Sequence, residues 1–383
     1  MPNFLLIPDS FKGSMSSGEV CERMERGIRR VYPQAGVRSV PVADGGEGTV
    51  DAFLAALGGE KRFVEVSGPF GEKIPAFYGW LANGTAVVEM AACAGLPQVE
   101  GMKNPEKTTT YGVGELLLEA ASRGARKIIL GLGGSCTNDG GCGAAAACGV
   151  RFYDASGKAF LPTGGTLTEV AAIDVSARNP LLDGVEIVTM CDIDNPLFGP
   201  EGAAFVFAPQ KGADAAMVAR LDAGLQHLSH TLQKMGIAIS KLPGAGAAGG
   251  MGGGMAAFWG SRLQMGIDAV LDAVSLETLL KDTDMVFTGE GRLDTQSLRG
   301  KVVLGVSRRV RPFGVPVVAI VGDVEGDVSA VYAEGITAVF STNRRAVPFS
   351  EAQRTCREDL DAVMENLMRF IDSARRHPLR WQQ

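Results

Sequence analysis

Charged side chains stand beside glycines at several points where an apolar run of the sequence ends. These segments are Asp9-Ser10-Phe11-Lys12-Gly13, Ala43-Asp44-Gly45-Gly46-Glu47-Gly48, Gly289-Glu290-Gly291-Arg292-Leu293-Asp294 and Gly322-Asp323. Phosphoryl transfer needs this combination. Backbone N–H groups cradle phosphate oxygens, Lys and Arg neutralise charge, and carboxylates hold Mg²⁺ or accept the proton of an attacking hydroxyl. The four segments therefore indicate chemistry on a phosphate.

Each of these signals also has a purely structural interpretation. Lys12 could be a solvated surface lysine, and Asp44 could serve as a turn residue or as the N-cap of the next helix. Glu290 is harder to explain in this way, because it lies between two glycines and close to Arg292 and Asp294. A structural salt bridge is the alternative there.

A further polar cluster, residues 133–141, directly follows an apolar run and reads Gly133-Gly134-Ser135-Cys136-Thr137-Asn138-Asp139-Gly140-Gly141. The alanine-rich sequence after it predicts a closely packed helix whose N-terminus faces the polar turn, a geometry that binds anions. A tight turn that needs glycine for steric reasons alone is the alternative. The position of Asn138 and Asp139 inside the turn favours a functional role.

Asp192, Asp194 and Asn195 also follow an apolar run. In a loop, carboxylates two residues apart can reach one hydrated Mg²⁺, whereas in a continuing strand they would point to opposite faces. Lys211 precedes a long helix and is either a charge clamp or a surface lysine.

Residues 244–250, which include Gly246 and Gly249, superficially resemble the dinucleotide fingerprint. No strand clearly precedes them, and no acid follows about 20 residues later. They predict a closely packed helix start, with backbone contact to nucleotide or substrate as the alternative. The sequence contains no Gly-x-x-x-x-Gly-Lys-Ser/Thr motif, which excludes a P-loop kinase.

The elements that must position these residues alternate between strands and helices at both ends of the chain. Residues 4–8, 17–31 and 37–42 predict a parallel β-α-β unit, with Ser16 or Ser17 as the helix N-cap. Near the C-terminus, residues 285–288, 315–321 and 338–341 predict three more strands, and residues 350–375 a closing helix. Between these regions, residues 63–90 alternate and are broken by turns, as in antiparallel hairpins. Strands at 127–132 and 185–190 and a helix at 213–235 follow.

Five parallel-type strands, two at the start and three at the end, predict one open, doubly wound α/β sheet interrupted by an inserted α/β domain. Two consecutive domains are the alternative, but they would leave only two parallel strands for an N-terminal sheet. The expected boundaries place residues 1–65 and 275–383 in the discontinuous domain and residues 66–274 in the insertion.

Composition narrows the class of protein. A chain of 383 residues predicts two domains. The net charge of −6 and the lack of a long basic run argue against nucleic acid as a partner. No apolar run reaches the roughly 20 residues of a membrane span, and the N-terminus resembles a strand rather than a signal peptide, so a cytoplasmic protein is expected. Seven cysteines without a CxxC pair predict free thiols.

The motifs, taken in order, resemble the type-1 glycerate kinases over about residues 1–375. The resemblance rests on Pro8-Asp9-Ser10-Phe11-Lys12-Gly13, Pro41-Val42-Ala43-Asp44-Gly45-Gly46-Glu47-Gly48-Thr49, residues 133–141, Cys191-Asp192 with Asn195-Pro196-Leu197, Pro209-Gln210-Lys211-Gly212-Ala213, residues 243–250, and residues 288–294 with Gly300-Lys301. Cys136 stands where the family usually has Ala, which puts a thiol near the expected site.

The resemblance implies transfer of the ATP γ-phosphoryl group to D-glycerate with Mg²⁺, and a flavodoxin-like domain carrying an inserted second domain. Many members of the family make 2-phosphoglycerate, in glyoxylate, glucarate or galactarate breakdown. The sequence leaves 3-phosphoglycerate open as the product, because one rotation of bound glycerate exchanges its two hydroxyls. Oligomeric state is not readable from the sequence.

The chemistry of the residues then suggests roles in a cleft between the two domains. Lys12 and Arg292 are the expected clamp for the glycerate carboxylate, with Asp9 and Ser10 beside them. Asp192 or Asp44 should accept the hydroxyl proton or order Mg²⁺, for which Glu290 and Asp294 are the other ligands expected. The nucleotide phosphates are assigned to Gly133, Gly134, Ser135, Thr137, Asn138, Asp139, Lys211, Gly246 and Gly249.

The sequence leaves two other classes of function as alternatives. A non-catalytic sensor of a small metabolite could use the same residues, although nothing in the sequence resembles a DNA-binding element to go with it. A dehydrogenase is disfavoured by the incomplete dinucleotide motif.

Overall fold

The computed structural model describes residues 1–43, 45–294 and 302–377. It divides into two compact units: unit 1 comprises residues 1–43 and 270–383, and unit 2 comprises residues 44–269. The sequence placed the first boundary near residue 65. Residues 45–65 instead belong to unit 2, because helix α2 (Thr49–Leu57) packs on the strands of that unit and β3 (Gly59–Ser67) pairs with one of them.

Unit 1 is built on a five-stranded parallel sheet in the order β14-β13-β12-β1-β2. Its strands are β1 (Asn3–Pro8), β2 (Gly36–Ser39), β12 (Met285–Leu293), β13 (Val317–Val324) and β14 (Ile336–Ser341). This is the flavodoxin-like order, in which strand succession reverses between β1 and β12. The prediction of one sheet built from both ends of the chain is confirmed.

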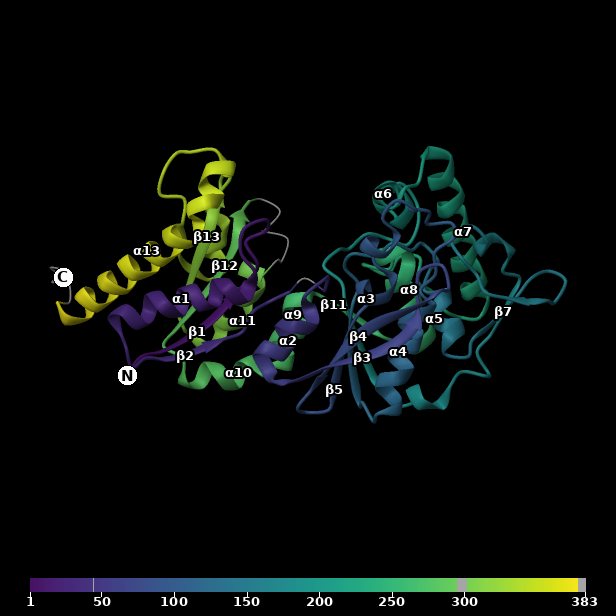
Figure 1. Ribbon diagram of the computed structural model, residues 1–383, viewed down its shortest axis with the longest axis horizontal. Coiled ribbons are helices and arrows are strands. Elements are labelled where there is room, and N and C mark those ends of the chain that lie inside the picture. Colours follow the sequence, from purple (N-terminus) through teal and green to yellow (C-terminus); the bar gives the residue numbers. More distant parts are fainter. Residues whose placement is uncertain (44, 295–301, 378–383) are drawn as a thin grey trace. The chain divides into compact units, whose positions relative to one another are not determined.

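Helices cover both faces of this sheet. Helices α1 (Ser17–Val31) and α13 (Phe349–Arg376) lie side by side against Phe4, Leu6 and Phe287 (Figure 1). Alternation along a strand directs Leu5 and Ile7 to the other face, and α11 (Val302–Val310) packs on the same central strands. The short helices α10 (Leu276–Leu279) and α12 (Ala330–Ala333) complete the unit.

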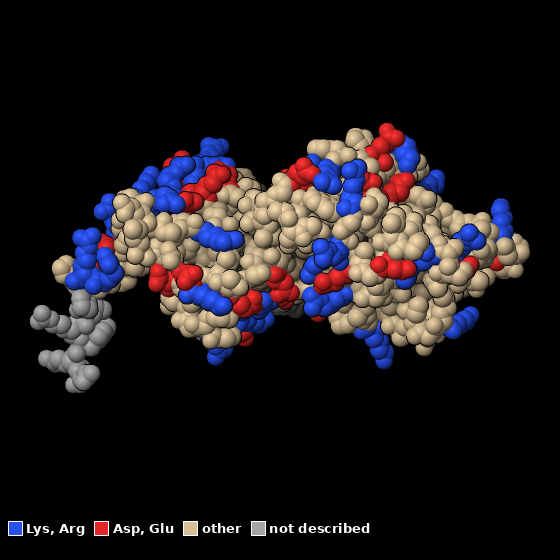
Figure 2. Space-filling view, turned by 90° about the horizontal axis from the view of Figure 1, so that it is seen from below, with Lys and Arg blue, Asp and Glu red and all other residues tan. Residues whose placement is uncertain are grey.

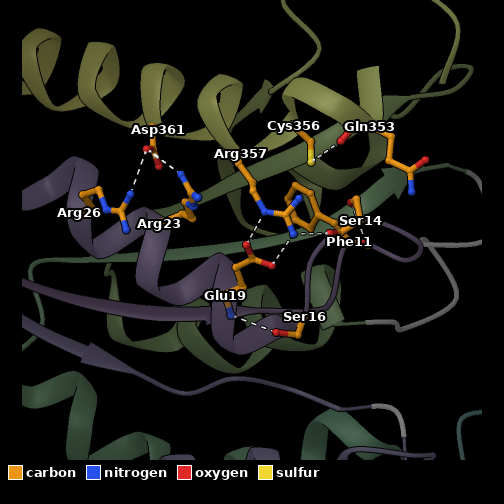
Figure 3. A network of polar contacts seen from close by, with 10 residues as sticks. All are labelled: Phe11, Ser14, Ser16, Glu19, Arg23, Arg26, Gln353, Cys356, Arg357 and Asp361. Carbon is orange, nitrogen blue, oxygen red and sulfur yellow. Dashed lines mark hydrogen bonds and ion pairs between the residues drawn. The ribbon is translucent and has the colours of Figure 1, made fainter. Parts of the chain in front are cut away.

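Ion pairs join α1 to α13 and fix the loop after β1 (Figure 3). Arg357 bonds Glu19 at 2.6 Å, and its guanidinium also donates to the carbonyl of Ser14. Asp361 accepts from Arg23 at 3.0 Å. Of the two predicted N-caps of α1, Ser16 is the one that accepts the Glu19 N–H. The N-terminal part of α13 therefore holds the segment that follows Lys12.

Unit 2 contains a six-stranded mixed sheet in the order β11-β10-β6-β5-β4-β3. Strands β5 (Thr85–Glu89), β6 (Lys127–Gly131), β10 (Glu186–Met190) and β11 (Arg262–Gln264) are parallel. Strands β3 and β4 (Lys73–Leu81) are antiparallel, which confirms the predicted hairpins. The helices of the unit are α2, α3 (Ala91–Ala94), α4 (Tyr111–Ser122), α5 (Cys142–Ala147), α6 (Ala203–Phe207), α7 (Ala215–Lys234), α8 (Ala247–Trp259) and α9 (Gly266–Ala273), the last reaching into unit 1.

Three features differ from the expectations. Strands β12 and β13 run on through Leu293 and Val324, because they stay paired beyond the glycines that were expected to end them. The small sheet of β7 (Arg151–Tyr153), β8 (Ala159–Phe160) and β9 (Ala172–Asp174) was not predicted, because its strands have only two or three residues. The closely packed helix start predicted at residues 244–250 is present at the beginning of α8, but its backbone is left-handed at Ala248, Gly249 and Gly250, which was not expected.

The surface carries no large region of one charge on the face drawn in Figure 2, where basic and acidic side chains are interspersed. Within the described ranges, no helix is long and apolar enough to cross a bilayer. All seven cysteines are free thiols, as expected.

Candidate functional site

The carboxyl ends of four parallel strands meet at one edge of the unit 2 sheet. Strand β5 ends in Glu89, β6 leads into Gly133-Gly134, β10 leads into Cys191-Asp192, and β11 leads into Gly266. Open α/β sheets bind their ligands at this edge. The two polar clusters that the sequence singled out in this region therefore lie on neighbouring strands.

Two glycine-rich loops pack backbone to backbone at this edge. The N–H of Gly133 donates to the carbonyl of Gly45 at 2.9 Å, and a Cβ at Gly133 would overlap the backbone of Gly46. Gly134, the next residue, is exposed. Glycine is required at Gly133 because no side chain fits between the two loops. At Gly134 this edge therefore exposes backbone that no side chain covers.

The rest of residues 133–141 is buried, which the sequence did not reveal. The Asp139 carboxylate has no exposed surface and accepts from the N–H of Thr110 at 2.7 Å, from the Thr110 hydroxyl at 2.9 Å, and from the N–H groups of Gly141 and Gly143. Burial raises the pKa of the Asp139 carboxyl, opposed by these bonds. Asp139 therefore organises the loop from within.

The backbone N–H groups at the N-terminus of α5, where an anion site was expected, already have acceptors within the chain. Gly141 and Gly143 donate their N–H groups to the Asp139 side chain, Cys142 donates to the Asp139 carbonyl, and Ala144 donates to the Thr110 hydroxyl at 2.9 Å. A helix N-terminus binds phosphate through free N–H groups. Here the buried carboxylate of Asp139 accepts the N–H groups of Gly141 and Gly143 that would otherwise bind an anion.

Lys211 is a buried ammonium group beneath the same loop. Its Nζ donates to the Ser135 hydroxyl and to the Thr137 carbonyl, each at 2.7 Å. Burial lowers the pKa of Lys211 to about 8, while the nearby Cys136 and Asp139 act in the opposite direction. The alternative of a plain surface lysine is wrong, since only 2% of Lys211 is exposed. Through these two hydrogen bonds, Lys211 holds Ser135 and Thr137 of the loop in position.

Asn138 and Thr137 carry buried polar atoms without a partner in the described part of the chain. They are both atoms of the Asn138 amide and the Thr137 hydroxyl. An unpaired buried group of this kind costs roughly 1–3 kcal/mol. Gly249 packs directly on this segment with φ +67, and a Cβ there would overlap the Thr137 carbonyl. Gly246 and Gly249 are buried packing positions, in agreement with the closely packed helix start.

Asp192 lies at the end of β10 and is exposed to solvent. Its Oδ1 accepts the N–H of Gly266, the first residue of α9, at 2.6 Å. The bond holds the carboxylate at a helix N-terminus, where negative charge is stabilised. Asp192 is thus an exposed acidic group at this edge, and Asp194 is also exposed.

Glu89 is a buried acid at the same edge that the sequence analysis did not single out. Its Oε1 accepts the N–H of Val50 at 2.5 Å, and the N–H of Gly48 also bonds the carboxylate. Burial raises the pKa of Glu89. The carboxylate caps α2 and so holds the loop that contains Gly45 and Gly46. An acid that ends the buried run Val87-Val88-Glu89 was the available signal.

In unit 1, the predicted residues gather where β1 and β12 end. Asp9 donates its N–H to the Gly289 carbonyl at 2.8 Å, and its side chain accepts the N–H of Ser10 at 2.6 Å. Lys12 is exposed, and its backbone lies against Gly291. The structure therefore brings Asp9, Ser10 and Lys12 to the switch point between β1 and β12.

The other predicted residues of unit 1 differ in environment. Glu290 is buried within β12, Asp294 is half-buried, and Arg292 is exposed and paired with Glu325 at 2.7 Å. Asp44, Gly300 and Lys301 lie outside the described residues. Among the residues that are described, no group of three His, Cys, Asp or Glu side chains converges as a ready metal site. Mg²⁺ in nucleotide enzymes takes one or two carboxylates and completes its shell with phosphates and water.

An open parallel sheet whose strands end in glycine-rich, charged turns defines the class of α/β proteins that bind small ligands at those ends. Comparison with known proteins identifies one family within this class. Residues 4–372 match the model of the glycerate kinase family. The glycerate kinase of Bacillus cereus (strain ATCC 10987 / NRS 248) is 44% identical over 366 residues, which cover 95% of this chain and 96% of that protein.

The glycerate 2-kinase of Escherichia coli (strain K12) is 43% identical over 366 residues, which cover 95% of this chain and 96% of that protein. A crystal structure assigned to glycerate kinase 2 of Salmonella typhimurium LT2 superimposes with a TM-score of 0.87 at 40% identity, over 98% of this chain and 99% of that one. The chain belongs to the glycerate kinase family and is an ATP-dependent kinase.

Proposed function

We propose that the protein transfers the γ-phosphoryl group of ATP to the 2-hydroxyl of D-glycerate, giving 2-phosphoglycerate and ADP. The observation that supports this most directly is the edge of unit 2, where bare glycine backbone at Gly133-Gly134 lies next to the strand that ends in the exposed Asp192. The Escherichia coli relative, a glycerate 2-kinase, supports the 2-hydroxyl as acceptor.

In the proposed reaction, the glycerate oxygen forms a bond to the γ-phosphorus while the bond from that phosphorus to the β-bridging oxygen breaks. ADP leaves with the electron pair of the broken bond, and the hydroxyl proton passes to Asp192. Lys12 holds the glycerate carboxylate, and Arg292 is the second basic group assigned to it. Asp192, Glu290 and Asp294 have the oxygen ligands that Mg²⁺ takes, and the ion when bound supplies charge neutralisation at the phosphates.

The Gly133–Gly141 segment is assigned to the nucleotide, and Asn138 provides a test of fit. Its amide is buried and unpaired, so it can bond a phosphate or base only if the loop shifts when nucleotide binds. Replacing it by the apolar isostere in Asn138→Leu should leave stability unchanged or higher, because the desolvated amide is gone. The variant should then show a smaller increase in Tm with ATP than the unchanged chain.

The decisive experiment measures ADP release with D-glycerate and identifies the product by phosphorus NMR. ADP release that depends on glycerate, with a 2-phosphoglycerate resonance, is the expected result. A 3-phosphoglycerate resonance would correct the acceptor hydroxyl and keep the kinase. Glycerate binding without turnover would favour the sensor.

The role of Asp192 is tested with Asp192→Asn, which keeps an oxygen acceptor for the Gly266 N–H. The variant should lower kcat by about 10²–10⁴-fold, the usual contribution of a general base. The Tm should not change. Asp194→Asn is the matched control, because Asp194 is exposed in the same segment but lacks the bond to α9. Equal turnover in both variants would remove Asp192 from the reaction.

A further inference from the structure

Strand β3 is the longest edge strand in the described structure. It has nine residues, whereas the other edge strands of the two large sheets, β2, β11 and β14, have four, three and six. It also pairs with β4 without a bulge and contains no proline. Short edges, bulges, prolines and charged side chains are the usual protection against pairing with another chain. Of these, β3 has only the charged side chains, which are of both signs. Of those edges, β3 offers the longest unbroken run for pairing with a further strand. Figure 1 shows β3 beside β4.

The hydrogen-bonding pattern shows which backbone groups of β3 are directed outward. The N–H of Gly68 donates to the Glu72 carbonyl at 2.6 Å and closes the hairpin, and Ser67 is opposite Lys73. Because bonded and non-bonded pairs alternate in an antiparallel ladder, the even-numbered residues of β3 bond to β4. The odd-numbered residues point N–H and C=O away from the sheet. The Ser67 N–H agrees, since it donates to the Glu115 side chain at 2.5 Å.

The side chains of the odd-numbered residues form a patch that is apolar at its centre. Phe63 is 74% exposed, and the centroid of its ring lies 6.2 Å from that of Phe77. Lys61 lies over the Phe77 ring at 4.4 Å and pairs with Asp51. Glu65 is exposed, and no ion pair of its carboxylate is found within the described residues. A basic and an acidic residue thus flank Phe63 at equal spacing.

We propose that β3 pairs with β3 of a second copy of this chain, antiparallel and centred on Phe63. In this register Phe63 is opposite Phe63, and Lys61 of each copy is opposite Glu65 of the other. All three are odd-numbered, so the outward backbone groups meet as bonded pairs. Cross-strand pairs of opposite charge and of aromatic rings each stabilise a sheet by roughly 0.2–1 kcal/mol. The segment is self-complementary in hydrogen bonding, charge and apolar surface.

The test uses charge reversal, because Glu65 is exposed and its replacement should not disturb the fold. Glu65→Lys places lysine opposite Lys61 at both ends of the interface and should raise the dimer Kd by about tenfold or more. Lys61→Glu combined with Glu65→Lys restores opposite charges and should return the Kd toward that of the unchanged chain. Glu65→Gln is the neutral control and should have an intermediate effect. Sedimentation velocity over a wide range of concentration measures each.

Hydrogen exchange identifies the strand directly. In the dimer, the amides of Lys61, Phe63 and Glu65 should be protected, and the protection should disappear on dilution and in Glu65→Lys. The amides of Arg62 and Val64 bond within the chain and should stay protected throughout. A chain that is monomeric at all concentrations would overturn the proposal. A dimer would also overturn the proposal if Glu65→Lys changed neither its Kd nor the hydrogen exchange of the odd-numbered amides of β3. The two copies would then meet at another surface.

Discussion

The loop at residues 133–141 in unit 2 and the loop at residues 9–13 in unit 1 both follow a parallel strand, and both combine glycine with charge. Their side chains have opposite environments. Asp139 and Asn138 are fully buried, whereas Lys12 is exposed and Asp9 and Ser10 are half-buried. A polar side chain in the first loop therefore holds the backbone in place. In the second loop it is available to a ligand. Substitutions in the first loop should therefore lower the free energy of unfolding, and substitutions in the second loop should lower kcat/KM.

The largest expected effect is loss of stability in the buried loop. Asp139→Ala removes the acceptor for the N–H groups of Thr110, Gly141 and Gly143, and each buried donor left without a partner costs roughly 1–3 kcal/mol. The free energy of unfolding, measured with urea, should fall by several kcal/mol. Asp139→Asn keeps one acceptor oxygen and should lose less. A loss below about 1 kcal/mol for the alanine variant would mean that water reaches these groups, and the contrast between the loops would fail.

The exposed loop should show the reverse. Lys12→Ala should lower kcat/KM for glycerate by about 10²–10³-fold, because a charged hydrogen bond to the substrate is lost, while urea unfolding changes by less than about 0.5 kcal/mol. Lys158→Ala removes another exposed lysine and serves as the control. Normal kinetics in Lys12→Ala, with or without a change in stability, would remove Lys12 from the site.

The pH dependence of stability tests the burial of Lys211 beneath the loop at residues 133–141. Its folded pKa of about 8 lies below the ordinary value of 10.5, so the unfolded chain binds more protons between these values. Stability should therefore rise with pH from about 8 to about 10.5, by at most about 3 kcal/mol. Lys211→Met has no such group and should lack the rise. Parallel pH profiles of the two proteins would show that Lys211 is solvated.

The sequence predicted the sheet of unit 1 well, because its strands are continuous apolar runs followed by glycine and charge. Ser16 as N-cap and the hairpins before Met90 were also predictable, since both depend on local patterns. Burial of Asp139 and Lys211 was not predictable. Their partners Thr110 and Ser135 lie 29 and 76 positions away along the chain. Residues 45–65 were assigned to the wrong unit for the same reason. Helix α2 and strand β3 belong to unit 2 because they contact strands that come later in the chain.

The smallest expected effect concerns Glu89, the buried acid that holds the Gly45-Gly46 loop. Glu89→Ala leaves the N–H groups of Gly48 and Val50 without their acceptor. Because Gly48 is only half-buried, water can replace the bond there, and the variant should cost about 1–2 kcal/mol in urea unfolding. Glu89→Gln keeps a carbonyl acceptor and should cost less.

The two variants of Glu89 also separate the cap from the charge. Because the folded pKa of Glu89 is raised above 4.5, the folded protein holds this proton more tightly than the unfolded chain does. Stability of the unchanged protein should therefore fall relative to Glu89→Gln as pH rises above about 4.5, until the folded carboxyl has also ionised. A constant difference across that range would show that the carboxylate is well solvated. Glu89 would then act on the loop through its hydrogen bonds alone, as an ordinary exposed helix cap does.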